Sequence, residues 1–82
     1  MIRSRPLYLY TREGCHLCER FMLELELDFP AVARSVALRD IDTELSWAAE
    51  YGLRIPVLAT PDDAVVCEGH YDRTRVEAAL GL

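Results

Sequence analysis

The spacing of apolar residues changes several times along this chain, and each change marks the boundary of a predicted element. The aromatic and aliphatic run 7–11 is typical of a buried strand and is followed by a glycine turn. From Cys15 onward, apolar residues recur at i+4 spacing with acidic residues opposite, which predicts an amphipathic helix that Pro30 ends. Its inward positions are expected to be Leu17, Phe21, Met22, Leu25 and Phe29.

The middle of the chain predicts a second strand and a second helix. Segment 32–41 has apolar residues among polar ones and is interpreted as a strand. Its apolar positions are Val36, Leu38 and Ile41. Asp42 or Thr43 can cap a helix that continues to Tyr51 and stops at Gly52. The inward face of this helix is expected to contain Leu45, Ala48 and Ala49.

The last third of the chain predicts a hairpin and a closing helix. Segments 55–60 and 64–68 have strand composition and are separated by the turn residues 61–63, so they are expected to pair. Asp72 or Thr74 can cap a last helix. The order strand, helix, strand, helix, strand, strand, helix is that of one α/β domain spanning residues 1–82. A right-handed crossover makes the first two strands parallel.

Composition and charge narrow the classes of function. The formal charge is −5 and the arginines are scattered, which argues against nucleic acid or an anionic membrane surface as a partner. No apolar run has the length of a membrane span, and we expect a cytoplasmic location. Three cysteines is an odd number, so a disulfide framework is not indicated, and a reducing compartment is favoured.

Cys15 and Cys18 form a C-x-x-C motif at the junction of the first strand and the first helix. In this context the motif is typical of a redox centre. The helix N-terminus favours a thiolate and lowers the pKa of a thiol from its ordinary value of about 8.5, so Cys15 is the candidate nucleophile. Cys18, one turn deeper, is the candidate resolving thiol. Arg12 can add positive charge near Cys15, against which Glu13 and Glu19 would act.

Two other interpretations of the cysteines remain open from the residues alone. Cys67 and His70 form a C-x-x-H pair that can join Cys15 and Cys18 in a Cys₃His zinc site, although the chain between the two pairs is long for such a site. Cysteines are also commonly buried as small apolar residues, which is the simplest interpretation of Cys67. His70 is expected in a surface loop, or close to Cys15, where it would tune the pKa of the thiol.

Three segments, 11–18, 52–58 and 68–72, give the chain a specific likeness. In these segments, which are distributed over nearly its whole length, it resembles the glutaredoxin-like branch of the thioredoxin superfamily, and most closely the small bacterial glutaredoxin-like proteins. The resemblance implies a thioredoxin fold of βαβαββα order. Its four-stranded mixed sheet would have the order 2-1-3-4 with the third strand antiparallel and helices on both sides. It also implies a cis peptide bond before Pro56.

The same resemblance assigns substrate-binding roles to five residues. A cationic residue three positions before the nucleophilic cysteine helps to bind glutathione in this family, and Arg12 has that place. Ile55, which precedes Pro56, would offer its backbone N–H and C=O groups to a bound peptide. Gly69 and Asp72 match the positions that hold the γ-glutamyl end of glutathione.

The sequence therefore predicts a thiol–disulfide oxidoreductase that uses the Cys15 and Cys18 dithiol, with protein or small-molecule disulfides as partners. Glutathione is a possible co-substrate, no tightly bound cofactor is expected, and the protein is expected to be monomeric. A non-catalytic binding module with the same fold is the alternative from another class of function, because a fold does not fix a function.

Overall fold

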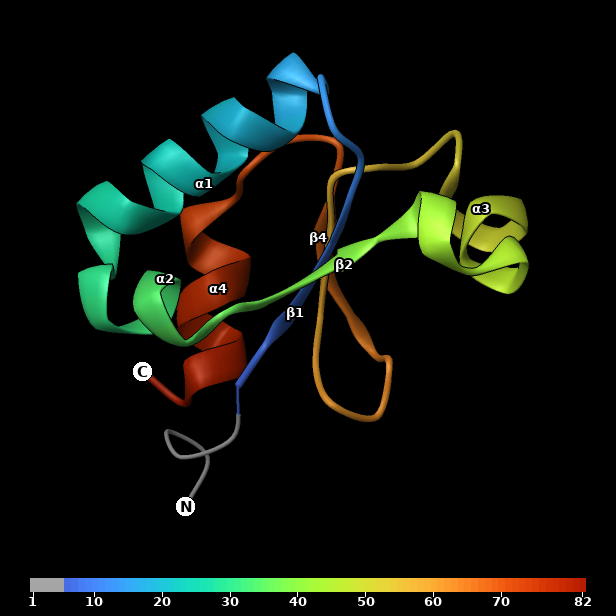
Figure 1. Ribbon diagram of the computed structural model, residues 1–82. Helices are drawn as coiled ribbons and strands as arrows, with labels where there is room; N and C mark the ends of the chain where they lie inside the picture. The colour runs from blue at the N-terminus through green and yellow to red at the C-terminus, as the bar shows by residue number, and fades with distance from the viewer. Residues whose placement is uncertain (1–5) are drawn as a thin grey trace.

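The computed structural model describes residues 6–82 and shows a four-stranded sheet with helices on both faces (Figure 1). The strands have the order β2-β1-β3-β4 in the sheet. The strands are β1 (Tyr8–Thr11), β2 (Ala37–Asp40), β3 (Val57–Ala59) and β4 (Val65–Glu68). The helices are α1 (His16–Asp28), α2 (Pro30–Ser35), the 3₁₀ turn η2 (Ile41–Thr43), α3 (Leu45–Tyr51) and α4 (Arg73–Leu80).

Strand pairing follows the predicted thioredoxin-fold pattern. β1 pairs parallel to β2 and antiparallel to β3, and β3 pairs antiparallel to β4. The predicted sheet order 2-1-3-4, with the third strand antiparallel, is confirmed. The parallel pair is connected through α1 and α2, since two parallel strands need a crossover connection.

Two apolar cores lie on opposite faces of the sheet because successive strand residues point to opposite sides. Leu9 of β1 packs into the core beneath α1 and α4, whereas Tyr10 packs into the core beneath α3. Figure 1 shows the same arrangement, with α1 and α4 on one side of the sheet and α3 on the other. The first core contains Leu7, Leu9, Phe21, Leu25, Leu58, Val66, Cys67 and Val76, and the second contains Tyr10, Ile41, Tyr51, Val57 and Ala59.

A shift of register in the β3–β4 hairpin changes which residues of β4 are buried. Leu58 pairs with Cys67 and the next residue, Ala59, pairs with Val65, so that Val66 is the extra residue of a bulge. As a result Val66 and Cys67, although adjacent, both pack into the core beneath α1 and α4.

The segment after Pro30 differs from the prediction. Pro30 was expected only to end the first helix, but it also begins α2, and the predicted strand 32–41 is reduced to β2 (Ala37–Asp40). The physical reason is that a helix does not use the N–H groups of its first turn, so proline fits well at its first position. Pro30 therefore separates α1 from α2.

Some of the predicted inward positions are exposed. Leu17 is 50% exposed and Leu45 91%, while Ala49 also faces solvent. In α1 the buried positions are Cys18, Phe21 and Leu25, which is a narrower stripe than the pattern predicted. Apolar residues at helical spacing therefore mark the correct helix but overstate its buried face.

The caps of the later helices are partly as predicted. Asp40, rather than Asp42 or Thr43, is the N-cap of the 3₁₀ turn, because its carboxylate accepts the Asp42 N–H at 2.9 Å, and α3 begins after Glu44 without a side-chain cap. Asp72 caps α4 as predicted, because its carboxylate accepts the Arg75 N–H at 3.2 Å. None of the helices within residues 6–82 combines the length and the apolar character needed to cross a membrane.

Removal of the Asp72 cap is expected to destabilise α4. We expect Asp72→Ala to lower the free energy of unfolding by about 1 kcal/mol, because an N–H of the first helical turn loses its acceptor. Urea unfolding followed by circular dichroism measures the change, and Asp72→Asn, which retains a capping oxygen, is the control. Equal losses in the two variants would show that the carboxylate acts through something other than the cap.

Candidate functional site

A tight turn after β1 places Cys15 at the start of α1. The Cys15 N–H donates to the Arg12 carbonyl at 3.1 Å, and Gly14 has a φ of +82°, a left-handed conformation that glycine adopts without steric cost. Cys15 itself is extended, with φ −82° and ψ 103°, and is the N-cap of α1. The strand, glycine turn and helix predicted from the sequence are therefore present at the motif.

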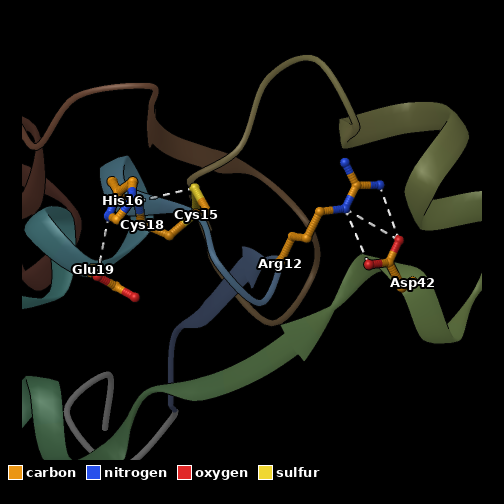
Figure 2. The surroundings of a disulfide bond; sticks show 6 residues. All are labelled: Arg12, Cys15, His16, Cys18, Glu19 and Asp42. Carbon is orange, nitrogen blue, oxygen red and sulfur yellow. Dashed lines mark hydrogen bonds and ion pairs between the residues drawn. A yellow bond between two sulfur atoms is a disulfide. The ribbon is translucent and has the colours of Figure 1, made fainter.

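Cys15 and Cys18 form a disulfide, with their Cα atoms 5.2 Å apart (Figure 2). The Cys15 sulfur also accepts the backbone N–H of Cys18 at 3.1 Å. Cys18 is only 3% exposed, whereas Cys15 is half-buried. The prediction that the two sulfurs lie within disulfide reach at the N-terminus of the first helix is confirmed, and Cys15 is the more accessible of the two.

Arg12 is held by an acidic residue at the end of the neighbouring strand. Its guanidinium forms a two-pronged contact with Asp42, with Nη2 to Oδ1 at 3.0 Å and Nε to Oδ2 at 3.1 Å. This hydrogen bonding raises the pKa of Arg12 above its ordinary value. In Figure 2 the guanidinium points away from the disulfide and toward Asp42. Asp42 therefore compensates the positive charge that Arg12 was expected to supply near Cys15.

Sequence reasoning missed the role of Asp42, although a signal for it was present. Parallel pairing places Thr11 opposite Asp40, so the residues that follow β1 and β2 emerge at the same edge of the sheet. Arg12 and Asp42 are the first oppositely charged pair beyond that edge. The expected parallel register would have brought these two residues together.

The other residues beside the motif are exposed to solvent. His16 Nδ1 lies 3.7 Å from Glu19 Oε1, and the His16 side chain is 96% exposed (Figure 2). The imidazole is therefore at the surface of the first turn of α1, and its contact with Glu19 is one turn away along the helix.

The loop before β3 reaches the same end of the sheet. The Ile55–Pro56 peptide bond is cis, as the resemblance implied. Antiparallel register places Val57 beside Tyr10 and Glu68, so that Pro56 and Gly69 are both near the end where β1 leads into the cysteine turn. The Gly69 N–H donates to the Pro56 carbonyl at 2.8 Å. Contact between Pro56 and the cysteine sulfurs stays a prediction, as do the substrate-binding roles of Ile55, Pro56, Gly69 and Asp72.

The Cys₃His zinc alternative is not supported by the donor geometry. Cys67 is buried in β4, in the core beneath α1 and α4, whereas Cys15 and Cys18 are joined to each other. His70 lies in the loop after β4, where it lines a small hollow together with Cys67 and Tyr71, and the lining of this hollow does not include Cys15 or Cys18. Across residues 6–82, His, Cys, Asp and Glu side chains come together in no group of three that could hold a metal ion.

Cys67 is a core residue, and its surroundings disfavour ionisation of its thiol. It is 4% exposed, and burial raises the pKa of its thiol above the ordinary value. Because the pKa of Cys67 is higher in the folded than in the unfolded protein, the fold favours the protonated thiol, and the free energy of unfolding falls as pH rises from the unfolded-state pKa through the folded-state pKa. The interpretation of Cys67 as a packing residue agrees with this environment.

The oxidised protein offers a direct test of Cys67, since Cys15 and Cys18 are then blocked. We expect iodoacetamide at pH 8 to leave the folded oxidised protein unmodified and to add one group per chain after unfolding in urea. The folded protein is expected to be unreactive because the thiolate that reacts is scarce in a buried group with a raised pKa. Mass spectrometry counts the added groups before and after unfolding. Rapid alkylation of the folded protein would contradict this account of Cys67.

An open groove of about 670 Å³ borders the disulfide on the side of β2. The groove is formed by β1, the cysteine turn, one side of α1 and β2. Its lining residues are Leu9, Thr11, Arg12, Glu13, Gly14, Cys15, Cys18, Glu19, Met22, Leu23, Glu26, Leu38 and Asp40. The sequence did not reveal this groove: of its two exposed leucines, Leu38 was identified only as an apolar position of the predicted strand, and Leu23 was not singled out.

Comparison with known proteins agrees with the fold and the motif. A family model described as Glutaredoxin-like domain (DUF836) matches residues 6–81. The chain belongs to this glutaredoxin-like family. No match to the chain is found among curated proteins.

Two solved structures resemble this glutaredoxin-like chain over most of their length. The solution NMR structure of protein Ne2328 from Nitrosomonas europaea is 31% identical with a TM-score of 0.77, and the match covers 90% of this chain and 88% of that one. The X-ray structure of target protein XcR50 from X. campestris is 32% identical with a TM-score of 0.71, covering 92% of this chain and 95% of that one.

Proposed function

We propose that this glutaredoxin-like chain is a thiol–disulfide oxidoreductase in which Cys15 is the nucleophile and Cys18 the resolving thiol. The observation that carries the proposal is the position of the disulfide at the N-terminus of a 13-residue helix. The unpaired N–H groups and the dipole of that end stabilise a thiolate. The Cys18 N–H already donates to the Cys15 sulfur in the oxidised state.

The difference in burial between the two cysteines supports a division of roles. A substrate disulfide can reach the half-buried Cys15, whereas Cys18 is 3% exposed and is reached chiefly through Cys15. The Cys15 thiolate attacks one substrate sulfur, the substrate S–S bond breaks, and the departing thiolate takes a proton from solvent. Cys18 then attacks the Cys15 sulfur, releases the second substrate thiol and forms the Cys15–Cys18 disulfide, so that two electrons pass to the substrate.

Return to the dithiol requires two electrons from an external thiol system, and glutathione is the proposed donor. A reducing compartment such as the cytoplasm would supply it. Of the five residues assigned to substrate binding, Arg12 lines the groove beside the disulfide. Its guanidinium is already paired with Asp42, so its attraction for the carboxylates of glutathione is weakened.

Release of Arg12 from its ion pair with Asp42 is expected to increase the reactivity of Cys15 toward anionic disulfides. We expect Asp42→Asn to raise the second-order rate constant for glutathione disulfide by about two- to fivefold at low ionic strength, because one carboxylate is removed and the guanidinium is freed. Stopped-flow fluorescence of the reduced protein measures the rate. The gain should disappear at high salt and in the double variant Arg12→Met, Asp42→Asn. An unchanged rate in Asp42→Asn would contradict the role given to this ion pair.

The experiment that tests the proposed function is the pH dependence of Cys15 alkylation in the reduced protein. An activated nucleophile is expected to react with iodoacetamide near its maximal rate at pH 7, where an ordinary thiol is mostly protonated. Peptide mapping by mass spectrometry assigns the adduct to Cys15. A rate that rises only around pH 8.5, as for a free cysteine, would contradict the proposal and favour a non-catalytic binding module.

A further inference from the structure

Of the five residues to which the family resemblance assigns substrate binding, Arg12 alone lines the groove beside the disulfide. Ile55, Pro56, Gly69 and Asp72 are not among the groove residues, whereas Cys15 is. The groove is bordered instead by α1 and the edge strand β2. A substrate segment on that side of the disulfide would contact a different surface from one held by the loop before β3.

One stripe of α1 continues directly from the disulfide along the groove. Helical spacing aligns Cys15 with Cys18 and Glu19, then with Met22, and then with Glu26. The eleven steps from Cys15 to Glu26 correspond to roughly 16 Å at 1.5 Å per residue. An extended peptide covers that length with about five residues.

Apolar side chains are exposed along this stripe and across from it. Leu23 on α1 is 60% exposed and Leu38 on β2 is 63% exposed, and both line the groove together with the half-buried Met22. The two exposed leucines in the groove lining offer apolar area to an incoming side chain, so the groove suits a ligand that has apolar as well as polar groups.

The charges along the groove have one predominant sign. Four carboxylate residues line it, at Glu13, Glu19, Glu26 and Asp40. Among residues 6–82, Arg12 is the arginine in the lining, and Asp42 compensates its charge through the two-pronged contact. The groove therefore attracts cations and repels anions such as glutathione, whose two carboxylates outnumber its single ammonium group.

We propose that this groove binds the cationic, partly apolar polypeptide segment that carries the substrate disulfide, so that the preferred substrate is a protein rather than glutathione disulfide. The inference rests on the proposed function, because it assigns the substrate of the same Cys15 nucleophile. About five residues next to the substrate cysteine lie along α1, with an apolar side chain against Leu23 and Leu38 and a basic side chain near Glu26. Charge complementarity selects this occupant.

Two matched peptides test the preference. Each carries a single cysteine as a mixed disulfide with 5-thio-2-nitrobenzoate, flanked by leucine and arginine in one peptide and by leucine and glutamate in the other. Cys15 attacks the peptide sulfur and expels the coloured thiolate, and Cys18 then releases the peptide thiol. The pre-reduced protein is expected to react with the arginine peptide at least about tenfold faster at low salt, with a smaller difference at high salt.

Paired variants on α1 distinguish the residues that line the groove from exposed residues elsewhere on the same helix. Glu26→Gln is expected to reduce the preference for the arginine peptide by about two- to fivefold, whereas Glu24→Gln, an exposed carboxylate outside the groove, leaves it unchanged. Leu23→Ser is expected to slow both peptides by about three- to tenfold, whereas Leu27→Ser, which is 83% exposed and outside the groove, does not. Alkylation of Cys15 at pH 7 in each variant controls for direct effects on the nucleophile.

The outcomes distinguish the two proposals. Equal rates for the two peptides, or equal effects of Glu26→Gln and Glu24→Gln, would overturn the groove inference and leave the oxidoreductase proposal intact. No release of the coloured thiolate by wild type above the rate of Cys15→Ser would overturn the oxidoreductase proposal itself. A faster reaction of the arginine peptide that depends on Glu26 and Leu23 is the result that supports the inference.

Discussion

Cys15→Ser is expected to reduce disulfide reductase activity to the uncatalysed background, because it removes the sulfur that forms the mixed disulfide. Cys18→Ser is expected to lose activity on intramolecular disulfides, which need a resolving thiol, but to retain activity on glutathione mixed disulfides, which need one thiol. The two variants have the same side-chain change, one at the N-cap of α1 and the other in its first turn. The measurement is initial rate with each substrate class at fixed protein concentration.

The Cys67→Ser variant is the matched control for that comparison. Cys67 lies in the core outside the motif, so its folded variant is expected to keep both activities. Equal activity of wild type and Cys15→Ser would show that the nucleophile is misassigned. Loss of the single-thiol reaction in Cys18→Ser, with Cys15 still alkylated normally, would contradict the division of roles.

Phe21→Ala is expected to cause the largest loss of stability in the chain. Phe21 is 1% exposed in the core beneath α1 and α4, and its ring meets Tyr71 edge to face with centroids 5.6 Å apart. Truncation of a buried phenylalanine removes apolar contacts and leaves a cavity, at a cost of about 3–5 kcal/mol. A domain of 82 residues has a total stability of roughly 4–12 kcal/mol, so this loss is between about a quarter and the whole of that stability.

Urea unfolding of the oxidised proteins measures that loss. Leu27→Ala is the control on the same helix, since Leu27 is 83% exposed, and it is expected to change the free energy of unfolding by less than about 0.5 kcal/mol. A loss below about 1 kcal/mol for Phe21→Ala would mean that α1 does not pack on the sheet as described.

The elements that were predictable from sequence are those whose signals are local. The glycine turn before Cys15, the Asp72 cap and the antiparallel hairpin each depend on neighbouring residues, and the structure contains all three. The error at Pro30 arose because the same residue that ends one helix can begin another. The composition of the following segment, 32–41, did not show whether Pro30 only ends the first helix or also begins a second one.

The features that could not be predicted depend on contacts between distant segments. The pairing of Arg12 with Asp42 requires the parallel register of β1 and β2, and the groove requires α1 and β2 to bring Leu23 and Leu38 to the same hollow. A prediction from apolar spacing assigns leucines to the buried face, but a small domain leaves some apolar side chains exposed. The motif was therefore visible in the sequence, whereas the surface that surrounds it was not.

The reduction potential of the Cys15–Cys18 pair tests the central claim most directly. Equilibration with redox buffers, followed by alkylation and mass spectrometry, counts the thiols at each potential and assigns them by peptide mapping. We expect a two-electron transition confined to Cys15 and Cys18, with a midpoint in the glutaredoxin range of about −200 to −230 mV. A midpoint below about −300 mV, which is typical of structural disulfides, would contradict it.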